Sequence, residues 1–218
     1  MTVELASRPK VKLRVDDFDL LALSGGLADL GRTELLDGDI YQMNSQYTRH
    51  GMVKAHFYNA LLDWSRTNRP EWVVLSEVSV AMPPHDEPIP DVILCDRPTG
   101  TKGIAVATVH LLIEIADDSR ARDLGYKKAL YARQGVPEYW VADLAEGRVW
   151  RFSSPGADGY ARRARAEVRR AHRGGDDCWV GGGDGGIVIG IVSQEFWNLA
   201  GAPSCASLTL PFGVMGVG

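Results

Sequence analysis

Apolar residues recur along this chain in two periods, one typical of helices and the other typical of strands. Helical spacing covers residues 15–29 and 50–64, and a third helix begins at Ser119 or Asp123 and ends near Gln134. An Asp-Gly pair between two apolar runs predicts a hairpin over residues 33–43. Further strands are predicted over residues 72–82, 92–95, 108–116, 138–142 and 148–152.

The run at residues 108–116 is predicted to be the central strand. Apolar residues occupy both of its faces before Glu114, which is typical of a strand that is covered on both sides. Helices and strands alternate through the middle of the chain, so we predict an α+β (α/β) fold built on a mixed sheet flanked by helices. After residue 174 the chain is rich in glycine, and its pattern favours only short strands near residues 187–192 and 208–210.

The composition is that of a globular protein of one ordinary domain. The chain has 218 residues, of which 45% are hydrophobic and 24% are charged. No apolar run approaches the ~20 residues of a membrane span, and the N-terminal residues lack the apolar region of a signal peptide. The three cysteines, Cys95, Cys178 and Cys205, form no CxxC pair, which disfavours a zinc cluster or a disulfide framework. We therefore expect a cytoplasmic protein with reduced thiols and no membrane partner.

Charge is distributed unevenly along the chain. The formal net charge of −4 counts against a constitutive, tight nucleic-acid binder. It does not count against a nuclease, whose carboxylates are negative until a cation binds them. Arginines crowd one short segment, and they either contact phosphates or, as the sequence alone favours, form a solvated face. They are Arg162, Arg163, Arg165, Arg169, Arg170 and Arg173.

Two carboxylates are associated with predicted strands. Glu114 lies inside an otherwise apolar run, where a charged side chain must be paired or bound to a metal. Asp91 follows Pro90 at the mouth of the strand at residues 92–95. On neighbouring strands the two side chains could share a divalent ion, and ligands that are all oxygen favour Mg²⁺ or Mn²⁺ over zinc.

Helical geometry selects one lysine as their partner. At about 100° per residue, Lys127 falls in the middle of the apolar arc of its helix, whereas Lys128 falls on the flank of that arc. Lys127 should therefore point inward, where it needs an anionic partner. A structural Lys–Glu salt bridge beneath the helix is the alternative. The presence of Asp91, and of a further carboxylate at Glu34 beside the hairpin, favours a functional site.

Several short motifs occur in a fixed order, and each alone is only weakly specific. They are Glu34-Leu-Leu-Asp-Gly-Asp-Ile-Tyr, His50 at the start of a helix, Pro90-Asp91-Val-Ile-Leu, Leu112-Ile-Glu114-Ile-Ala-Asp-Asp-Ser119, Asp123 with Lys127 and Tyr131, and Gly135-Val-Pro-Glu-Tyr-Trp140-Val-Ala-Asp143. The ordered set is far more specific. It resembles the Uma-type (DUF820-like) restriction endonuclease family of the PD-(D/E)xK nuclease superfamily.

This resemblance implies a restriction-endonuclease-like fold, a mixed sheet with a helix on each face. It implies that Asp91 and Glu114 bind a catalytic Mg²⁺ (or Mn²⁺), that Glu34 is a third carboxylate ligand, and that Lys127 is the catalytic lysine. The superfamily usually carries its lysine two residues after the acid. Ala116 occupies that position here, so the amine would come from the following helix instead.

The resemblance also bears on domain organisation and assembly. It implies a nuclease domain over residues 1–160, and a homodimer, because family members look like homodimers. Residues 161–218, rich first in arginine and then in glycine, depart from the family pattern. We expect this segment to pack on the same domain or to extend it.

The leading hypothesis is a Mg²⁺-dependent endonuclease that hydrolyses DNA. One alternative is a catalytically inactive protein that keeps the nuclease fold and has a structural or nucleic-acid-binding role, and another is a different metal hydrolase on the same scaffold. Two side chains have two interpretations each. His50 either contacts phosphate or a water or, as favoured, is exposed or caps its helix; Asp123 either pairs with Lys127 or, as favoured, serves the helix N-terminus.

Overall fold

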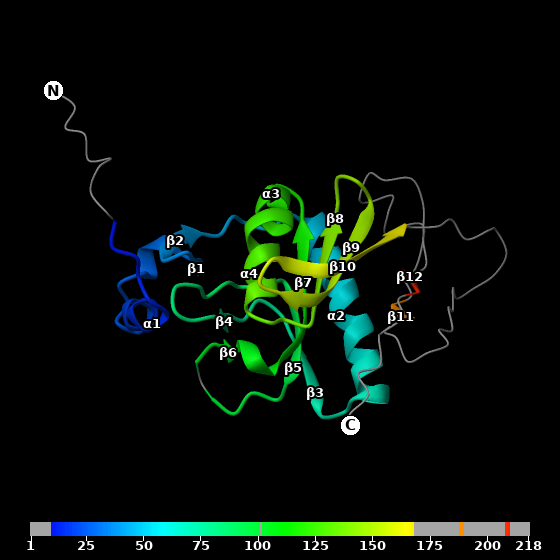
Figure 1. The fold of residues 1–218 in the computed structure, drawn as a ribbon. Helices are drawn as coiled ribbons and strands as arrows, with labels where there is room; N and C mark the ends of the chain where they lie inside the picture. Colours follow the sequence, from blue (N-terminus) through cyan, green and yellow to red (C-terminus); the bar gives the residue numbers. More distant parts are fainter. Residues whose placement is uncertain (1–9, 101, 168–187, 190–207, 210–218) are drawn as a thin grey trace.

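The computed structural model describes residues 10–100, 102–167, 188–189 and 208–209 (Figure 1). Its centre is a six-stranded sheet in the order β10-β9-β8-β7-β5-β3. Within this sheet β7 and β8 are parallel, and the other neighbouring pairs are antiparallel, so the predicted mixed sheet is confirmed. The strands are β3 (Trp72–Leu75), β5 (Val92–Asp96), β7 (Val109–Ala116), β8 (Glu138–Asp143), β9 (Arg148–Gly156) and β10 (Gly159–Glu167).

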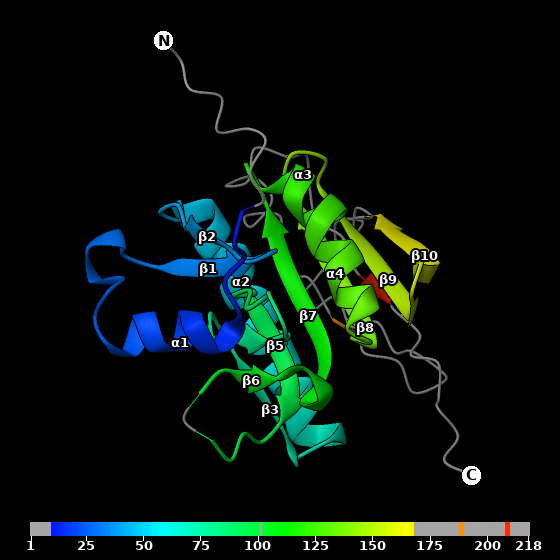
Figure 2. The same ribbon diagram turned by 60° about the vertical axis from the view of Figure 1, so that its left-hand side comes forward.

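Helices cover both faces of the sheet, as Figures 1 and 2 show. On one face lies α2 (Thr48–Asn68). On the other lies a composite helix that consists of α3 (Arg120–Arg122), a π-helical turn (Asp123–Lys127) and α4 (Lys128–Arg133). This composite helix connects the parallel pair β7 and β8, which is the usual way of joining parallel strands.

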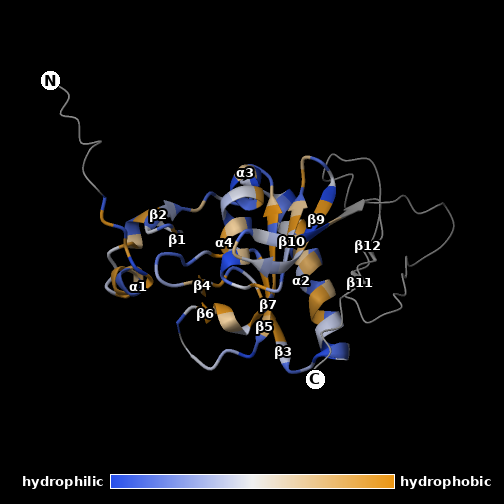
Figure 3. Ribbon diagram, in the orientation of Figure 1, coloured by the Kyte–Doolittle hydropathy of each residue, from blue (hydrophilic) through white to orange (hydrophobic). Residues whose placement is uncertain are grey.

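The hydrophobic core has two halves, one on each face of the sheet. Phe57 and Leu61 of α2 pack with Trp140, and Tyr131 of α4 packs with Tyr139. Tyr139 and Trp140 are neighbours in β8, and they serve opposite halves because successive strand residues point to opposite faces. Figure 3 shows the apolar residues concentrated along the central strands and the helix sides that cover them. The burial of β7 on both faces confirms that it is the central strand.

The N-terminal residues form a helix and a hairpin beside the main sheet. The helix is α1 (Val15–Leu23), and the hairpin strands are β1 (Thr33–Leu36) and β2 (Asp39–Gln42). α1 ends earlier than the sequence predicted, because Gly25 with φ +79° allows the chain to leave the helix. The predicted hairpin is confirmed, and both of its turn residues have positive φ. A Cβ at Gly38 would lie 2.9 Å from the carbonyl oxygen of Leu13, so the turn requires glycine there.

The single strand predicted over residues 72–82 is wrong. The structure has β3 and a separate β4 (Val80–Ala81), which pairs with β6 (Ile104–Ala105) in a small parallel sheet. The chain changes direction between them at Glu77, which has φ +57°. Lys54 and Arg32 both form ion pairs with the Glu77 carboxylate. Contacts with distant segments therefore stabilise the interruption between β3 and β4, which the local sequence pattern did not reveal.

The arginine-rich segment begins as an edge strand that the sequence did not predict. β10 pairs with β9 along its length, so residues 161–167 extend the main sheet. An edge strand with one solvated side needs few apolar residues, which explains the missing pattern. Arg169, Arg170 and Arg173 lie outside the described residues, as does most of the tail. The described part of the tail is one short antiparallel pair, β11 (Val188–Ile189) and β12 (Leu208–Thr209).

In the described part of the chain, no helix combines the length and the apolar composition that a membrane crossing requires.

Candidate active site

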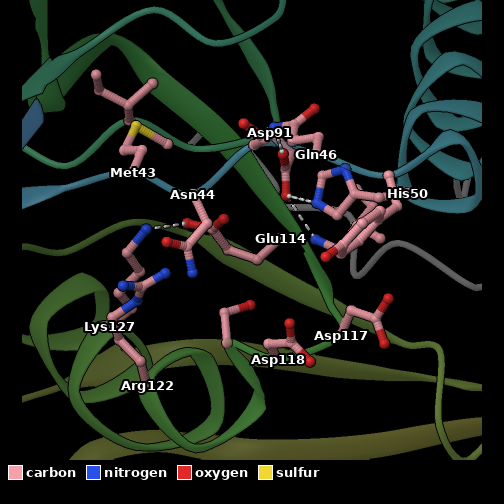
Figure 4. Close-up of a pocket in the computed structure, with 15 residues that line it drawn as sticks. Met43, Asn44, Gln46, His50, Asp91, Glu114, Asp117, Asp118, Arg122 and Lys127 are labelled. Carbon is pink, nitrogen blue, oxygen red and sulfur yellow. Dashed lines mark hydrogen bonds and ion pairs between the residues drawn. The ribbon is translucent and has the colours of Figure 1, made fainter. Parts of the chain in front are cut away.

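A cavity of about 380 Å³ lies at the carboxyl end of β7, between the start of α3 and the segment that precedes α2. Three of the predicted site residues, Asp91, Glu114 and Lys127, line it (Figure 4). They come from the start of β5, from β7 and from the composite helix, so the fold brings three separate elements to one place. The other lining residues are Met43, Asn44, Ser45, Gln46, Tyr47, His50, Ile89, Ile115, Asp117, Asp118, Ser119 and Arg122.

Lys127 points inward, as the helical count predicted, and its side chain is 2% exposed. Its Nζ donates a hydrogen bond to Oε1 of Glu114 at 3.0 Å. The same Nζ lies 2.9 Å from Oε2 of Glu34. The hydroxyl of Tyr131 donates to the same Glu114 oxygen at 2.9 Å. The Glu114 carboxylate is therefore held by two donors that follow it in the chain.

Asp91 is the residue immediately before β5, and its side chain is buried. Both of its carboxylate oxygens have contacts. Its Oδ2 accepts a hydrogen bond from the backbone N–H of Ile115 at 2.8 Å, across the β5–β7 pair. The same oxygen lies 3.3 Å from Nε2 of His50, and Oδ1 accepts a hydrogen bond from Gln46 at 3.3 Å. Figure 4 shows His50 and Gln46 reaching Asp91 from the side of α2.

Glu34 is fully buried, but it does not line the cavity. It contacts Lys127 instead, and its Oε2 accepts a hydrogen bond from the N–H of Ile89 at 3.3 Å. Arg122 lies 3.7 Å from the other oxygen, Oε1. The structure therefore places Glu34 with the lysine, and its role as a third metal ligand stays a prediction.

Burial and mutual contact set the charges of this cluster. Burial raises the pKa of Glu114 well above its ordinary value, and the nearby Lys127 opposes this shift only in part. Burial acts to lower the pKa of Lys127, but Glu114 and Glu34 outweigh it and hold that pKa above its ordinary value. The amine is therefore a cation at neutral pH. A metal ion at Glu114 would compete with a proton for the same carboxylate.

Asp123 lies one turn before Lys127 and is buried. The hydroxyl of Ser119 donates to its carboxylate, and burial raises its pKa above the ordinary value. The positive charge of Lys127 opposes part of this rise in the pKa of Asp123. Asp123 is also the first residue of the π-helical turn of the composite helix. Pairing with Lys127 and a role at the helix N-terminus both stay predictions for this residue.

Sequence reasoning missed the side chains that hold Asp91. The favoured interpretation of His50 as exposed or capping is wrong, because its side chain is only 13% exposed and meets Asp91. Gln46, Asp117 and Asp118 also line the cavity without having been predicted. The sequence indicated only that His50 lies in the first turn of a predicted helix. That position does not reveal which strand the side chain faces.

Of the three predicted metal ligands, Asp91 and Glu114 line the cavity and Glu34 does not. Among residues 10–100, 102–167 and the two short tail strands, no group of three or more His, Cys, Asp or Glu side chains is placed to hold an ion. Asp91 and Glu114 share the cavity, and the negative charge of Asp91 contributes to the raised pKa of Glu114. The two carboxylates are therefore close enough to interact.

Comparison with known proteins identifies relatives. The family model Uma2, described as "Putative restriction endonuclease", matches residues 15–173. A solved structure, that of "a putative nuclease belonging to DUF820" from Anabaena variabilis ATCC 29413, superposes with a TM-score of 0.53 at 15% sequence identity. The match covers 66% of this chain and 81% of that chain, and at this identity it shows the fold alone. No curated protein matches the chain.

Proposed function

The chain belongs to the Uma2 family, and on that premise we propose that it is a Mg²⁺- or Mn²⁺-dependent endonuclease that hydrolyses DNA phosphodiester bonds. The observation that carries the proposal is the meeting of Asp91, Glu114 and Lys127 on one cavity. A structural Lys–Glu salt bridge would need neither Asp91 nor the cavity. Two acids and a charged amine beside a polar cavity match the needs of metal-assisted phosphoryl transfer.

Asp91 and Glu114 would hold the ion. Mg²⁺ prefers oxygen ligands, and it commonly uses one or two carboxylates together with waters and substrate phosphates. A pair of carboxylates without a third acid fits this pattern. When bound, the ion would polarise the scissile phosphate and lower the pKa of a coordinated water.

The remaining groups position these acids and balance charge. The Lys127 ammonium lines the cavity, where it stabilises the negative charge that develops on the phosphate during attack by water. Tyr131 and the N–H of Ile115 fix one carboxylate oxygen each, which limits the rotation of Glu114 and Asp91. His50, in the first turn of α2, also contacts the Asp91 carboxylate.

A cleavage assay with the wild-type chain tests the proposal. Plasmid and single-stranded DNA are incubated with Mg²⁺, with Mn²⁺ and with EDTA, and we expect cleavage with either metal and none with EDTA. DNA binding without cleavage would favour the catalytically inactive alternative. Metal-dependent hydrolysis of other esters, but not of DNA, would favour a different hydrolase on this scaffold.

Assembly and location belong to the same proposal. We propose a cytoplasmic location, as the cysteine pattern predicts, and a homodimer, as the family resemblance implies. Light scattering should then give twice the mass of one chain. A monomer would contradict the dimer but not the nuclease, since one chain supplies every residue that lines the cavity.

Arg163 is predicted to contact a DNA phosphate beyond the cavity. It is exposed on the edge strand β10, and its guanidinium lies 4.0 Å from the ring centroid of Trp150, which orders it. The strand register places Arg163 beside Phe152 of β9 and, through Tyr139 of β8, level with Leu112 of β7, which is two residues before Glu114. A phosphate contact from this position would add to the affinity for any DNA sequence.

Replacing Arg163 by glutamine should weaken binding of a labelled duplex in metal-free buffer. We expect the slope of log K against log salt to fall by about 1, as for the loss of one phosphate contact. The control is Arg66→Gln, because Arg66 is 69% exposed on α2, across the sheet. Equal slopes for the two variants would contradict the contact.

A further inference from the structure

Glu34 contacts the proposed catalytic amine from outside the cavity. Building on the proposed nuclease function, we propose that Glu34 is a positioning residue that holds Lys127 beside the metal site, and that it is not a ligand of the ion. The two carboxylates that hold the amine lie in different surroundings. Glu114 lines the cavity, whereas Glu34 is fully buried and does not.

This difference matters once a cation binds. Glu114 already gives Oε1 to both Lys127 and Tyr131, and its carboxylate also faces the cavity. A divalent ion on Glu114 would compete with Lys127 for the same negative charge. Glu34 does not line the cavity, so its contact with the amine does not involve the face of Glu114 that an ion would use. Lys127 therefore retains one buried anionic partner when the site is loaded.

Glu34 is itself fixed by the segment that leads to Asp91. Its Oε2 accepts the N–H of Ile89, two residues before Asp91. The next residue of β1, Leu35, exchanges backbone hydrogen bonds with Glu87 at 2.8 and 3.2 Å. The segment from Glu87 to Asp91 therefore contacts β1 at Glu34 and also carries Asp91. This arrangement fixes the position of Glu34 relative to Asp91.

The same contacts argue against a ligand role for Glu34. Its Oε2 already receives the Lys127 amine at 2.9 Å and the Ile89 N–H. In the part of the chain that the structure describes, the other oxygen, Oε1, is buried without a hydrogen-bond partner, and the guanidinium of Arg122 lies 3.7 Å from it. Within the described residues, no three acids, Glu34 included, are arranged to hold one ion.

The test compares Glu34→Gln with Asp91→Asn and with Glu87→Gln as a matched control. Glu87 is also buried and lies beside β1, but it does not contact the lysine. Calorimetric titration with Mg²⁺ should give wild-type affinity for Glu34→Gln and no binding for Asp91→Asn. The single-turnover cleavage rate of Glu34→Gln should fall about 10²-fold, as expected for a misplaced catalytic group. Glu87→Gln should change neither quantity.

A direct readout of the lysine separates positioning from general damage to the fold. Labelling by an amine-reactive reagent, read by mass spectrometry, should spare Lys127 in the wild type and in Glu87→Gln but modify it in Glu34→Gln. Loss of Mg²⁺ binding in Glu34→Gln would overturn the proposal, because Glu34 would then be a ligand. Wild-type cleavage with a protected Lys127 in that variant would overturn it equally.

A measurement on the wild-type chain covers the case in which Glu34→Gln does not fold. A crystal soaked with Mn²⁺ locates the ion by its anomalous signal, and we expect Glu34 to remain on the Lys127 amine. A Glu34 oxygen at coordination distance, about 2.1 Å, would overturn the proposal. If the wild-type chain binds no divalent ion in calorimetry, the proposed nuclease function fails instead, and the labelling experiment still tests the anchor.

Discussion

Asp91→Asn is expected to abolish metal binding and to lower the DNA cleavage rate by at least about 10²–10³-fold, the scale of losing one main electrostatic group of an active site. The asparagine side chain has the same shape, and its oxygen can still accept the N–H of Ile115. The fold should therefore survive. The neutral amide, however, lacks the charge that attracts a divalent ion. Plasmid cleavage and a calorimetric Mg²⁺ titration measure the two losses.

The control for this substitution lies at the other end of the same strand. Asp96 ends β5 with its side chain 54% exposed, and it pairs with His110 far from the cavity. Asp96→Asn should cleave DNA at the wild-type rate. Cleavage that persists at the wild-type rate in Asp91→Asn would mean that another site, or a contaminating nuclease, performs the reaction.

The features that the sequence predicted correctly are those set by local periodicity. Glu114 is conspicuous because six apolar residues of the same strand are buried around it, and the burial of apolar surface drives the formation of that strand. Lys127 follows from the same logic, since a charged residue on the buried arc of a helix must have a partner. Asp91 was found from the turn that precedes its strand.

The features that sequence reasoning missed depend on contacts between segments that are distant along the chain. His50 meets Asp91 across the layer between α2 and the sheet, and no local period specifies that meeting. The pairing of Glu34 with Lys127 similarly requires the hairpin to lie against the composite helix. The helix also contains a π-helical turn at residues 123–127, so a regular 100° count describes its faces only approximately.

Lys127→Met should destabilise the chain by about 3–5 kcal/mol at neutral pH, the usual cost of removing one partner from a buried ion pair. Methionine fills similar space, so the loss comes from charge. Glu34 and Glu114 would remain buried beside each other without their cation. Cleavage should be lost as well. Urea unfolding measures the stability, and Lys128→Met is the control, because that lysine is only half-buried and touches a phenylalanine ring.

The pH dependence identifies the cause of this loss. Burial already raises the pKa of Glu114, and Lys127 is the largest influence that opposes the rise, so removing the lysine raises that pKa further. A carboxyl group whose pKa is higher in the folded than in the unfolded chain favours folding at low pH, and this contribution is lost as the pH rises through the folded-state pKa. The stability deficit of Lys127→Met should therefore be smallest below the unfolded-chain pKa of about 4.3 and should grow as the pH rises. A deficit that does not change with pH would point to lost packing, and would contradict a buried carboxylate cluster held together by this lysine.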